Sequence, residues 1–206
     1  MTGVTEGVEI TTIADLPAGI GLGSSSALTV GLLNALHAFK GEWQTPAELA
    51  AKACQIEIEV LGHPIGKQDQ YIAAFGGLQE IQFNPDDSVQ VRPVICARQT
   101  RARLQRHLLL FYTGTHREAG SVLNEARGRM ASSAEARANV DRLVAMADSV
   151  KKLLIGSRVP RLGPLMAESW RVKKQMATGV TTPALDRLYR RAIRAGADGG
   201  KVSGAG

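Results

Sequence analysis

One stretch of the sequence decides the fold: Pro17-Ala18-Gly19-Ile20-Gly21-Leu22-Gly23-Ser24-Ser25-Ser26-Ala27-Leu28. Its alternating glycines permit positive φ angles and let the backbone approach a ligand closely. Serine is a favoured N-cap residue, so we expect at least one of the serines to accept a hydrogen bond from an amide of the first helical turn. The other amides and the positive end of the helix dipole favour an anion. The stretch therefore predicts a phosphate-binding loop at the start of a helix.

The spacing of the glycines excludes two common phosphate-binding motifs. A Walker A loop requires a lysine after its second glycine, and no lysine follows these glycines. A dinucleotide fingerprint requires a third glycine where Ser24 stands and an acidic residue at the end of the next strand, whereas Glu42 follows a predicted helix. A glycine-rich turn that only caps a helix remains the alternative.

Apolar periodicity and turn residues predict the remaining elements. We expect strands over residues 8–13 and 108–112, and a hairpin whose strands span residues 78–84 and 89–95. The expected helices span residues 24–40, 46–61, 71–75, 118–130, 134–155, 164–178 and 183–195. This mixture of strands and helices predicts the α+β class.

Two of the helix starts carry the pattern of a capping box. Thr45 with Glu48 forms the first pair, and Ser132 with Glu135 forms the second. The apolar positions of the first two helices recur at helical spacing and predict their buried faces. They are Leu28, Leu32, Leu33, Leu36 and Phe39 in the first, and Leu49, Ala53, Ile56 and Val60 in the second.

The composition is that of a globular chain. The 206 residues are 44% hydrophobic, and the mean hydropathy is −0.06. No apolar run reaches the ~18 residues of a membrane span, and no basic signal peptide begins the sequence. Cys54 and Cys96 show neither metal-binding nor redox spacing. We therefore expect a cytoplasmic protein that does not bind a membrane.

The net charge of +6 is concentrated in arginine clusters at residues 98–106 and 187–194. Aromatic residues make up only 4% of the chain, so no base-stacking platform is evident and we expect no nucleic-acid partner. Solvated helix faces account for the arginines. The positive charge also suits anionic substrates such as nucleotides and sugar phosphates.

Residues in and after the loop offer the groups that phosphoryl transfer requires. Mg²⁺ prefers hard oxygen ligands, and Ser25 and Glu57 provide a hydroxyl and a carboxylate. Asp69 is the candidate base for the acceptor hydroxyl. The alternatives are that Glu57 is an exposed helix acid and that Asp69 caps a helix.

The glycine–serine stretch resembles the central phosphate-binding motif of the GHMP kinases, the superfamily of galactokinase, homoserine kinase, mevalonate kinase and phosphomevalonate kinase. The spacing Glu57-x4-Gly62-x3-Gly66-x2-Asp69-Gln70 is similar to the segment with the magnesium-binding Glu and the catalytic Asp in the sugar kinases of this family. The last eight residues, 199–206, resemble the start of the third family motif. The resemblance implies ATP and Mg²⁺ as cofactors, with Asp69 catalytic and with Ser25 and Glu57 on the metal. It places the ATP phosphates on Pro17, Gly19, Gly21, Leu22, Gly23, Ser24, Ser25, Ser26 and Ala27.

Three segments resemble the heptose 7-phosphate kinase branch of the family: residues 56–62, 66–71 and 111–114. This resemblance implies phosphorylation of the anomeric C1 hydroxyl of D-glycero-D-manno-heptose 7-phosphate to the 1,7-bisphosphate. The implied substrate-binding residues are Lys67, Gln70, Tyr112, Gly114, Arg117, Gly204 and Gly206. A fucokinase- or galactokinase-like enzyme of a neutral sugar and a non-catalytic GHMP-fold binding module are the alternatives.

The resemblance also implies the architecture. We expect a GHMP kinase fold, with a ribosomal S5 domain 2-like N-terminal domain over residues 1–93 and a ferredoxin-like, helix-rich C-terminal domain over residues 94–206. The first family motif and the last strands have no counterpart in the sequence, so we expect an internal fragment, truncated at both ends. The expected partners are ATP and a sugar or sugar phosphate, and formation of a homodimer stays open.

Overall fold

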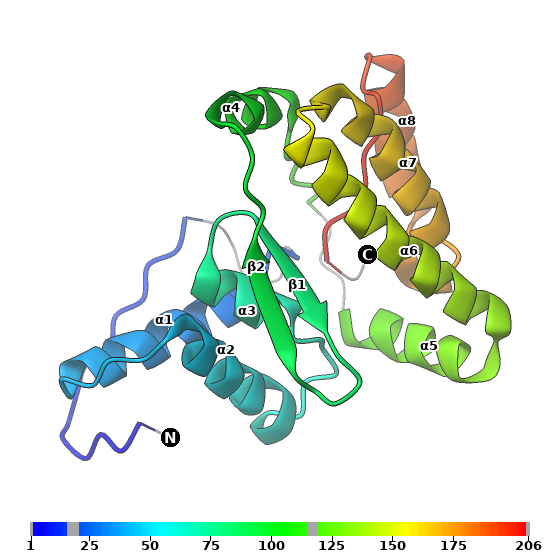
Figure 1. Cartoon of the computed structure of the whole chain (residues 1–206). Helices are drawn as coiled ribbons and strands as arrows, with labels where there is room; N and C mark the ends of the chain where they lie inside the picture. Colours follow the sequence, from blue (N-terminus) through cyan, green and yellow to red (C-terminus); the bar gives the residue numbers. More distant parts are fainter. Residues whose placement is uncertain (1, 16–20, 115–118, 205–206) are drawn as a thin grey trace. The chain divides into compact units, whose positions relative to one another are not determined.

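The computed structural model describes residues 2–15, 21–114 and 119–204, and the chain divides into two compact units (Figure 1). The first unit comprises Met1–Arg92 and the second Pro93–Gly206. Each unit has apolar clusters of its own, so each can be described from its own packing.

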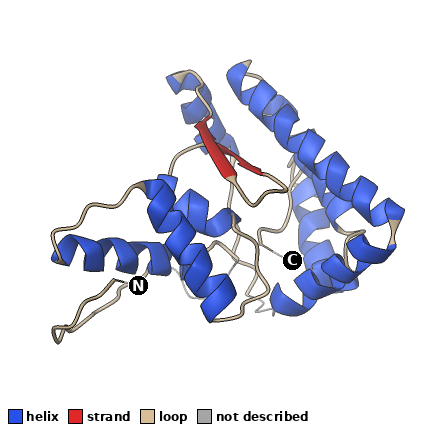
Figure 2. Cartoon of the chain, turned by 60° about the horizontal axis from the view of Figure 1, so that its bottom comes forward, coloured by secondary structure: helices blue, strands red, loops and turns tan. Residues whose placement is uncertain are grey.

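The first unit consists of three packed helices and a β-hairpin. Its elements are α1 (Ser24–Phe39), α2 (Pro46–Cys54), the π-helix η1 (Gln55–Val60), α3 (Gln68–Phe75), β1 (Gln79–Phe83) and β2 (Val89–Pro93). The helices α1, α2 and α3 pack against one another. The hairpin is the only sheet in the part of the chain that the structure describes (Figure 2). It contacts α3, and Ile81, Val89 and Val91 pack on a cluster that contains Tyr71.

The predicted start of α2 is confirmed. The Thr45 hydroxyl accepts from the Glu48 amide at 3.2 Å, and the Glu48 carboxylate accepts from the Thr45 amide at 2.7 Å. This reciprocal pair satisfies two amides that the helix itself cannot pair. The hairpin and α1 are also confirmed, with bounds within two residues of the predicted ones. The helix predicted at residues 71–75 begins earlier, at Gln68.

The predicted buried face of α1 is wrong in part. Leu33 is buried, but Leu28 and Phe39 are 51% and 58% exposed. The buried residues of α1 instead include Val30 and His37. Val30 packs with Leu33 against α2. Since apolar residues occur on more than one side of α1, only its packing partners decide which side becomes the core.

The two single strands predicted at residues 8–13 and 108–112 are wrong. Neither segment is a strand, and Ile13 and Leu109 are 93% and 78% exposed. A strand forms only where a neighbouring strand pairs its amides and carbonyls. Within the described residues only β1 and β2 pair in this way. The alternation at residues 8–13 and the apolar run at residues 108–112 were therefore not enough to predict a strand.

Apart from Pro93 at the end of β2, the regular elements in the described residues of the second unit are all helices. Its elements are α4 (Arg98–His107), α5 (Ala119–Ser132), α6 (Ala134–Ile155), η2 (Val159–Arg161), α7 (Leu162–Lys173), η3 (Thr178–Val180) and α8 (Pro183–Arg194). The long helix α6 packs beside α7 (Figure 1). Trp170 on α7 is only 2% exposed and packs with Val122, Ala177 and Val180. No helix of the described ranges is both long enough and apolar enough to span a membrane.

The second predicted capping box is wrong by one residue. The N-cap of α6 is Ser133, whose hydroxyl accepts from the Ala136 amide at 3.3 Å. Ser132 is instead the last residue of α5, and its hydroxyl donates to the Gly128 carbonyl at 3.0 Å. Because α5 continues through Ser132, the extended residue that can cap the next helix is Ser133.

These adjacent serines provide a matched test of the boundary between α5 and α6. Ser133→Ala removes the cap and should lower the free energy of unfolding by about 1 kcal/mol. Ser132→Ala removes only a bond to the carbonyl four residues back, so it should change that free energy by less than about 0.5 kcal/mol. Urea unfolding followed by circular dichroism measures both. A larger loss for Ser132→Ala would place the cap at Ser132.

Candidate active site

The start of α1 has no serine cap, contrary to the sequence prediction. Gly23 is the N-cap, with φ 71° and ψ 25°, and no described side chain caps the helix. The first bond of the helix runs from the Ala27 amide to the Gly23 carbonyl at 2.9 Å. The amides of the first turn are therefore not used by a capping side chain, which is the arrangement that binds an anion.

The serine hydroxyls instead donate to the carboxylate of Glu57. Ser25 Oγ donates to Oε1, and Ser26 Oγ donates to Oε2 at 2.7 Å. Gln70 Nε2 donates to the same Oε2 at 2.5 Å. Glu57 is 0% exposed, so its interpretation as an exposed helix acid is wrong. The starts of α1 and α3 and the π-helix η1 thus meet at one carboxylate.

Glu57 continues the buried face of α2, since it follows the buried Ala53 by four residues and the buried Cys54 by three. Along η1 the turns are wider, as the bond from the Leu61 amide to the Ile56 carbonyl at 2.9 Å shows. The wider turn changes the direction of each following side chain. The buried face therefore does not extend along η1 as predicted, and Val60, expected on that face, is 62% exposed.

Asp69 lies in the first turn of α3, close to the Gly23 backbone. A Cβ atom on Gly23 would lie 3.2 Å from both Cβ and Cγ of Asp69. Partial burial raises the pKa of the Asp69 carboxyl above its ordinary value, and the nearby Glu57 carboxylate raises the pKa further. The N-cap of α3 is Lys67, so Asp69 is not the helix cap.

The donor set at Glu57 fits a magnesium ion. A carboxylate and the Ser25 hydroxyl are hard oxygen donors, and Mg²⁺ needs only one or two carboxylates besides water and phosphate oxygens. Among the described residues, neither Glu57 nor Asp69 forms an ion pair with a lysine or arginine. The described part of the chain also contains no cluster of three or more His, Cys, Asp or Glu side chains that could hold a metal ion by itself. A cation at Glu57 would therefore need ligands from a bound phosphate or from water.

Other predicted residues of the first unit lie in different settings. Lys67 Nζ forms a 2.7 Å ion pair with Asp87 in the hairpin turn. Gln70 is 0% exposed, so its side chain faces Glu57 rather than solvent. Gly21 adopts a φ of 73°, as expected for the loop, and Leu22 is 39% exposed.

The remaining predicted residues belong to the second unit or fall outside the description. Tyr112 is 63% exposed, and Gly114 has a φ of 68°. The Gly204 carbonyl accepts from Lys173 Nζ. Four predicted residues lie outside the described ranges: Pro17, Gly19, Arg117 and Gly206.

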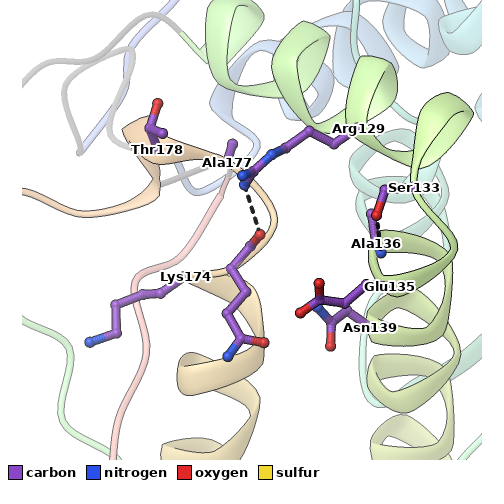
Figure 3. Close-up of a pocket in the computed structure, with 9 residues that line it drawn as sticks. Arg129, Ser133, Glu135, Ala136, Asn139, Lys174, Ala177 and Thr178 are labelled. Carbon is purple, nitrogen blue, oxygen red and sulfur yellow. Dashed lines mark hydrogen bonds between the residues drawn. The ribbon is translucent and has the colours of Figure 1, made fainter.

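A polar hollow of about 420 Å³ lies within the second unit, among α5, α6 and the end of α7 (Figure 3). Arg129 reaches across it and donates to the Gln175 carbonyl at 2.9 Å. Asn139, only 5% exposed, also lines it. None of the predicted site residues lines this hollow, and no motif in the sequence indicated it.

Gly23, the N-cap of α1, and Gly31, within α1, test how closely the loop packs against Asp69. Gly23→Ala places a side chain at positive φ and 3.2 Å from Asp69, so it should lower the free energy of unfolding by about 1–2 kcal/mol. Gly31→Ala, on the same helix with nothing within 4 Å, should instead raise that free energy by about 0.5–1 kcal/mol. Thermal and urea unfolding measure both. Equal effects would mean that Gly23 is not constrained.

Comparison with known proteins supports the interpretation of these motifs. Residues 1–77 match the family GHMP kinases N terminal domain, and residues 146–206 match the family GHMP kinases C terminal. Together the two matches cover about two thirds of the chain. The first contains the loop, Glu57 and Asp69.

The proteins that are similar to this chain include several named kinases. The chain is 33% identical to a D-glycero-alpha-D-manno-heptose 7-phosphate kinase of Campylobacter jejuni, over 95% of this chain and 57% of that protein. It is 33% identical to a mevalonate kinase of Methanothermobacter thermautotrophicus, over 93% of this chain and 59% of that protein. The crystal structure of a D-glycero-D-manno-heptose 1-phosphate kinase from Bacteroides thetaiotaomicron aligns with a TM-score of 0.64 and 31% identity, over 93% of this chain and 53% of that one.

The chain thus spans between half and three fifths of the length of these proteins. The GHMP kinase fold expected from the glycine–serine stretch is confirmed, and the described residues form a mostly helical structure with one small sheet. The division into family domains at residues 93 and 94 stays a prediction. On the evidence of both family matches and of these relatives, the chain belongs to the GHMP kinase family.

Proposed function

We propose that this chain forms the ATP- and Mg²⁺-binding part of a sugar kinase, and that the acceptor is the anomeric C1 hydroxyl of D-glycero-D-manno-heptose 7-phosphate. The product would be the 1,7-bisphosphate. One observation carries the kinase assignment: Ser25, Glu57 and Asp69, distant in sequence, lie together at the uncapped start of α1. The similarity to a heptose 7-phosphate kinase supports the choice of acceptor.

The start of α1 would bind the nucleotide phosphates. Its amides after Gly23 have no capping side chain, and the helix dipole adds positive potential there. Glu57 and Ser25 would hold Mg²⁺, which neutralises negative charge on the phosphates when it is bound. The residues of the chain thereby fix the nucleotide with its terminal phosphate near Asp69.

Asp69 would accept the proton of the acceptor hydroxyl. Partial burial and the nearby Glu57 carboxylate raise the pKa of Asp69, which makes it a stronger base than an ordinary Asp. Contact with Gly23 positions the carboxyl beside the loop. A loose transition state for phosphoryl transfer requires only such positioning and a late proton transfer.

A neutral sugar is the second candidate acceptor, as in a fucokinase- or galactokinase-like enzyme. The observation that favours it is the ion pair between Lys67 and Asp87 at 2.7 Å. Lys67 is one of the substrate-binding residues that the resemblance implied, and its pairing reduces the positive charge that it offers to a heptose phosphate.

The cysteines support a cytoplasmic location. Cys54 and Cys96 are both free and buried. Burial raises the pKa of the Cys54 thiol to about 11, so the reactive thiolate is scarce at neutral pH. Unpaired structural thiols of this kind are typical of reducing compartments.

The test is Asp69→Asn in the natural protein that contains this chain. Turnover of heptose 7-phosphate, L-fucose and galactose with MgATP should fall by roughly 100-fold or more, while ATP binding is kept. Asp148→Asn, an exposed acid on α6, is the matched control and should retain turnover. The ratio of kcat/KM among the three sugars identifies the acceptor.

Unfolding of the Asp69→Asn variant would not explain its loss of turnover. Since the pKa of Asp69 is raised in the folded chain, its ionisation lowers stability progressively above the ordinary value of 3.8. Asp69→Asn should therefore keep or raise Tm at pH 7, and the difference should vanish below that value. Near-normal turnover of the variant would remove Asp69 from catalysis. A wild type that binds MgATP but transfers phosphate to none of the sugars would favour the non-catalytic module.

A further inference from the structure

The two oxygens of Glu57 have different surroundings. Oε2 accepts two hydrogen bonds, from Ser26 Oγ at 2.7 Å and Gln70 Nε2 at 2.5 Å. Oε1 accepts a hydrogen bond from Ser25 Oγ. The donors to Oε2 are buried, with Ser26 3% and Gln70 0% exposed, whereas Ser25 is exposed. Both oxygens are buried, since Glu57 is 0% exposed, but only Oε1 has a donor on an exposed residue of the loop.

We propose that Gln70 and Ser26 are positioning residues, which hold Oε2 of Glu57 so that Oε1 and the Ser25 hydroxyl face the bound Mg²⁺. This inference rests on the proposed function. It gives Gln70 a role behind the metal site in place of the contact with substrate that the sequence resemblance implied.

Burial is the first argument for this role. A fully buried carboxylate is costly unless hydrogen bonds replace its lost hydration. Within the described residues no lysine or arginine pairs with Glu57, so the neutral donors Ser25, Ser26 and Gln70 provide this compensation. Two of the three act on Oε2, which fixes the carboxylate plane from the side of its buried donors.

The orientation of the Gln70 amide is the second argument. A carboxylate only accepts, so the amide must turn Nε2 toward Glu57. Its Oε1 is then buried, with no hydrogen-bond partner within the described residues. An unpaired buried acceptor destabilises the fold, so this orientation has a structural cost. The contact with Glu57 offsets that cost, as expected of a group that supports a binding site.

The elements that carry the donors are the third argument. Ser26 is in the first turn of α1 and Gln70 in the first turn of α3, while Glu57 is on η1. The two bonds to Oε2 therefore tie three elements to one atom. Such outer partners of a metal ligand control its orientation, and their loss weakens metal binding by roughly 10- to 100-fold.

The first experiment measures ATP affinity with saturating Mg²⁺ and with EDTA, by isothermal titration calorimetry on the natural protein that contains this chain. Gln70→Met keeps the length of the side chain but removes the amide. It should reduce the gain in ATP affinity on adding Mg²⁺ by roughly 10- to 100-fold and leave the affinity in EDTA unchanged. Ser26→Ala should act in the same direction. Gln68→Met, at an exposed position of the same helix, is the matched control and should behave as wild type.

The second experiment tests the contact without any ligand, by thermal unfolding of a double-mutant cycle. Gln70→Met should lower Tm in the wild type, because it removes a donor from a buried carboxylate. In a Glu57→Met background there is no carboxylate to support, so the same change should leave Tm unchanged or raise it.

The outcomes separate this inference from the proposed function. An unchanged Mg²⁺ effect in Gln70→Met, or an additive cycle, overturns the positioning role. A wild type without any Mg²⁺-dependent ATP binding overturns the proposed function together with the role that rests on it. In that case a non-additive cycle would still show that Gln70 supports Glu57, but only as part of the fold.

Discussion

The buried carboxylate of Glu57 is the constraint on which the first unit depends. A negative charge that is 0% exposed must be compensated where it lies, and within the described residues the compensation comes from three neutral donors. These donors belong to α1 and α3, so the two helix starts are held at fixed positions around η1. Stability and the geometry of the site thus share the same hydrogen bonds.

This arrangement has local costs that point to function. The serines donate to Glu57 instead of capping α1, and the start of that helix remains uncapped. Asp69 is partly buried and lies near a second carboxylate, and both raise its pKa. Gln70 keeps a buried oxygen without a partner in the described structure. Such departures from local preference concentrate where a protein binds a ligand, and they support the proposed binding of a nucleotide phosphate and Mg²⁺.

Local patterns in the sequence predicted much of the fold. The Thr45 cap, α6 and the hairpin depend on neighbouring residues and were found. The strands at residues 8–13 and 108–112 were wrong, because strand formation depends on a partner elsewhere in the chain. The motifs identified the family and placed Glu57 among its functional residues. The hydrogen bonds of Glu57 were not predictable, since they join it to helix starts that are distant in the sequence.

The central claim is that the uncapped start of α1 binds nucleotide phosphates through its backbone. The most direct measurement is the change in amide ¹H and ¹⁵N chemical shifts when MgATP is added to the isotope-labelled protein. The account predicts the largest changes at the amides of Ser24, Ser25 and Ser26, and smaller ones when EDTA removes the metal. Changes confined to the hollow around Arg129 and Asn139, with none at these serines, would contradict it.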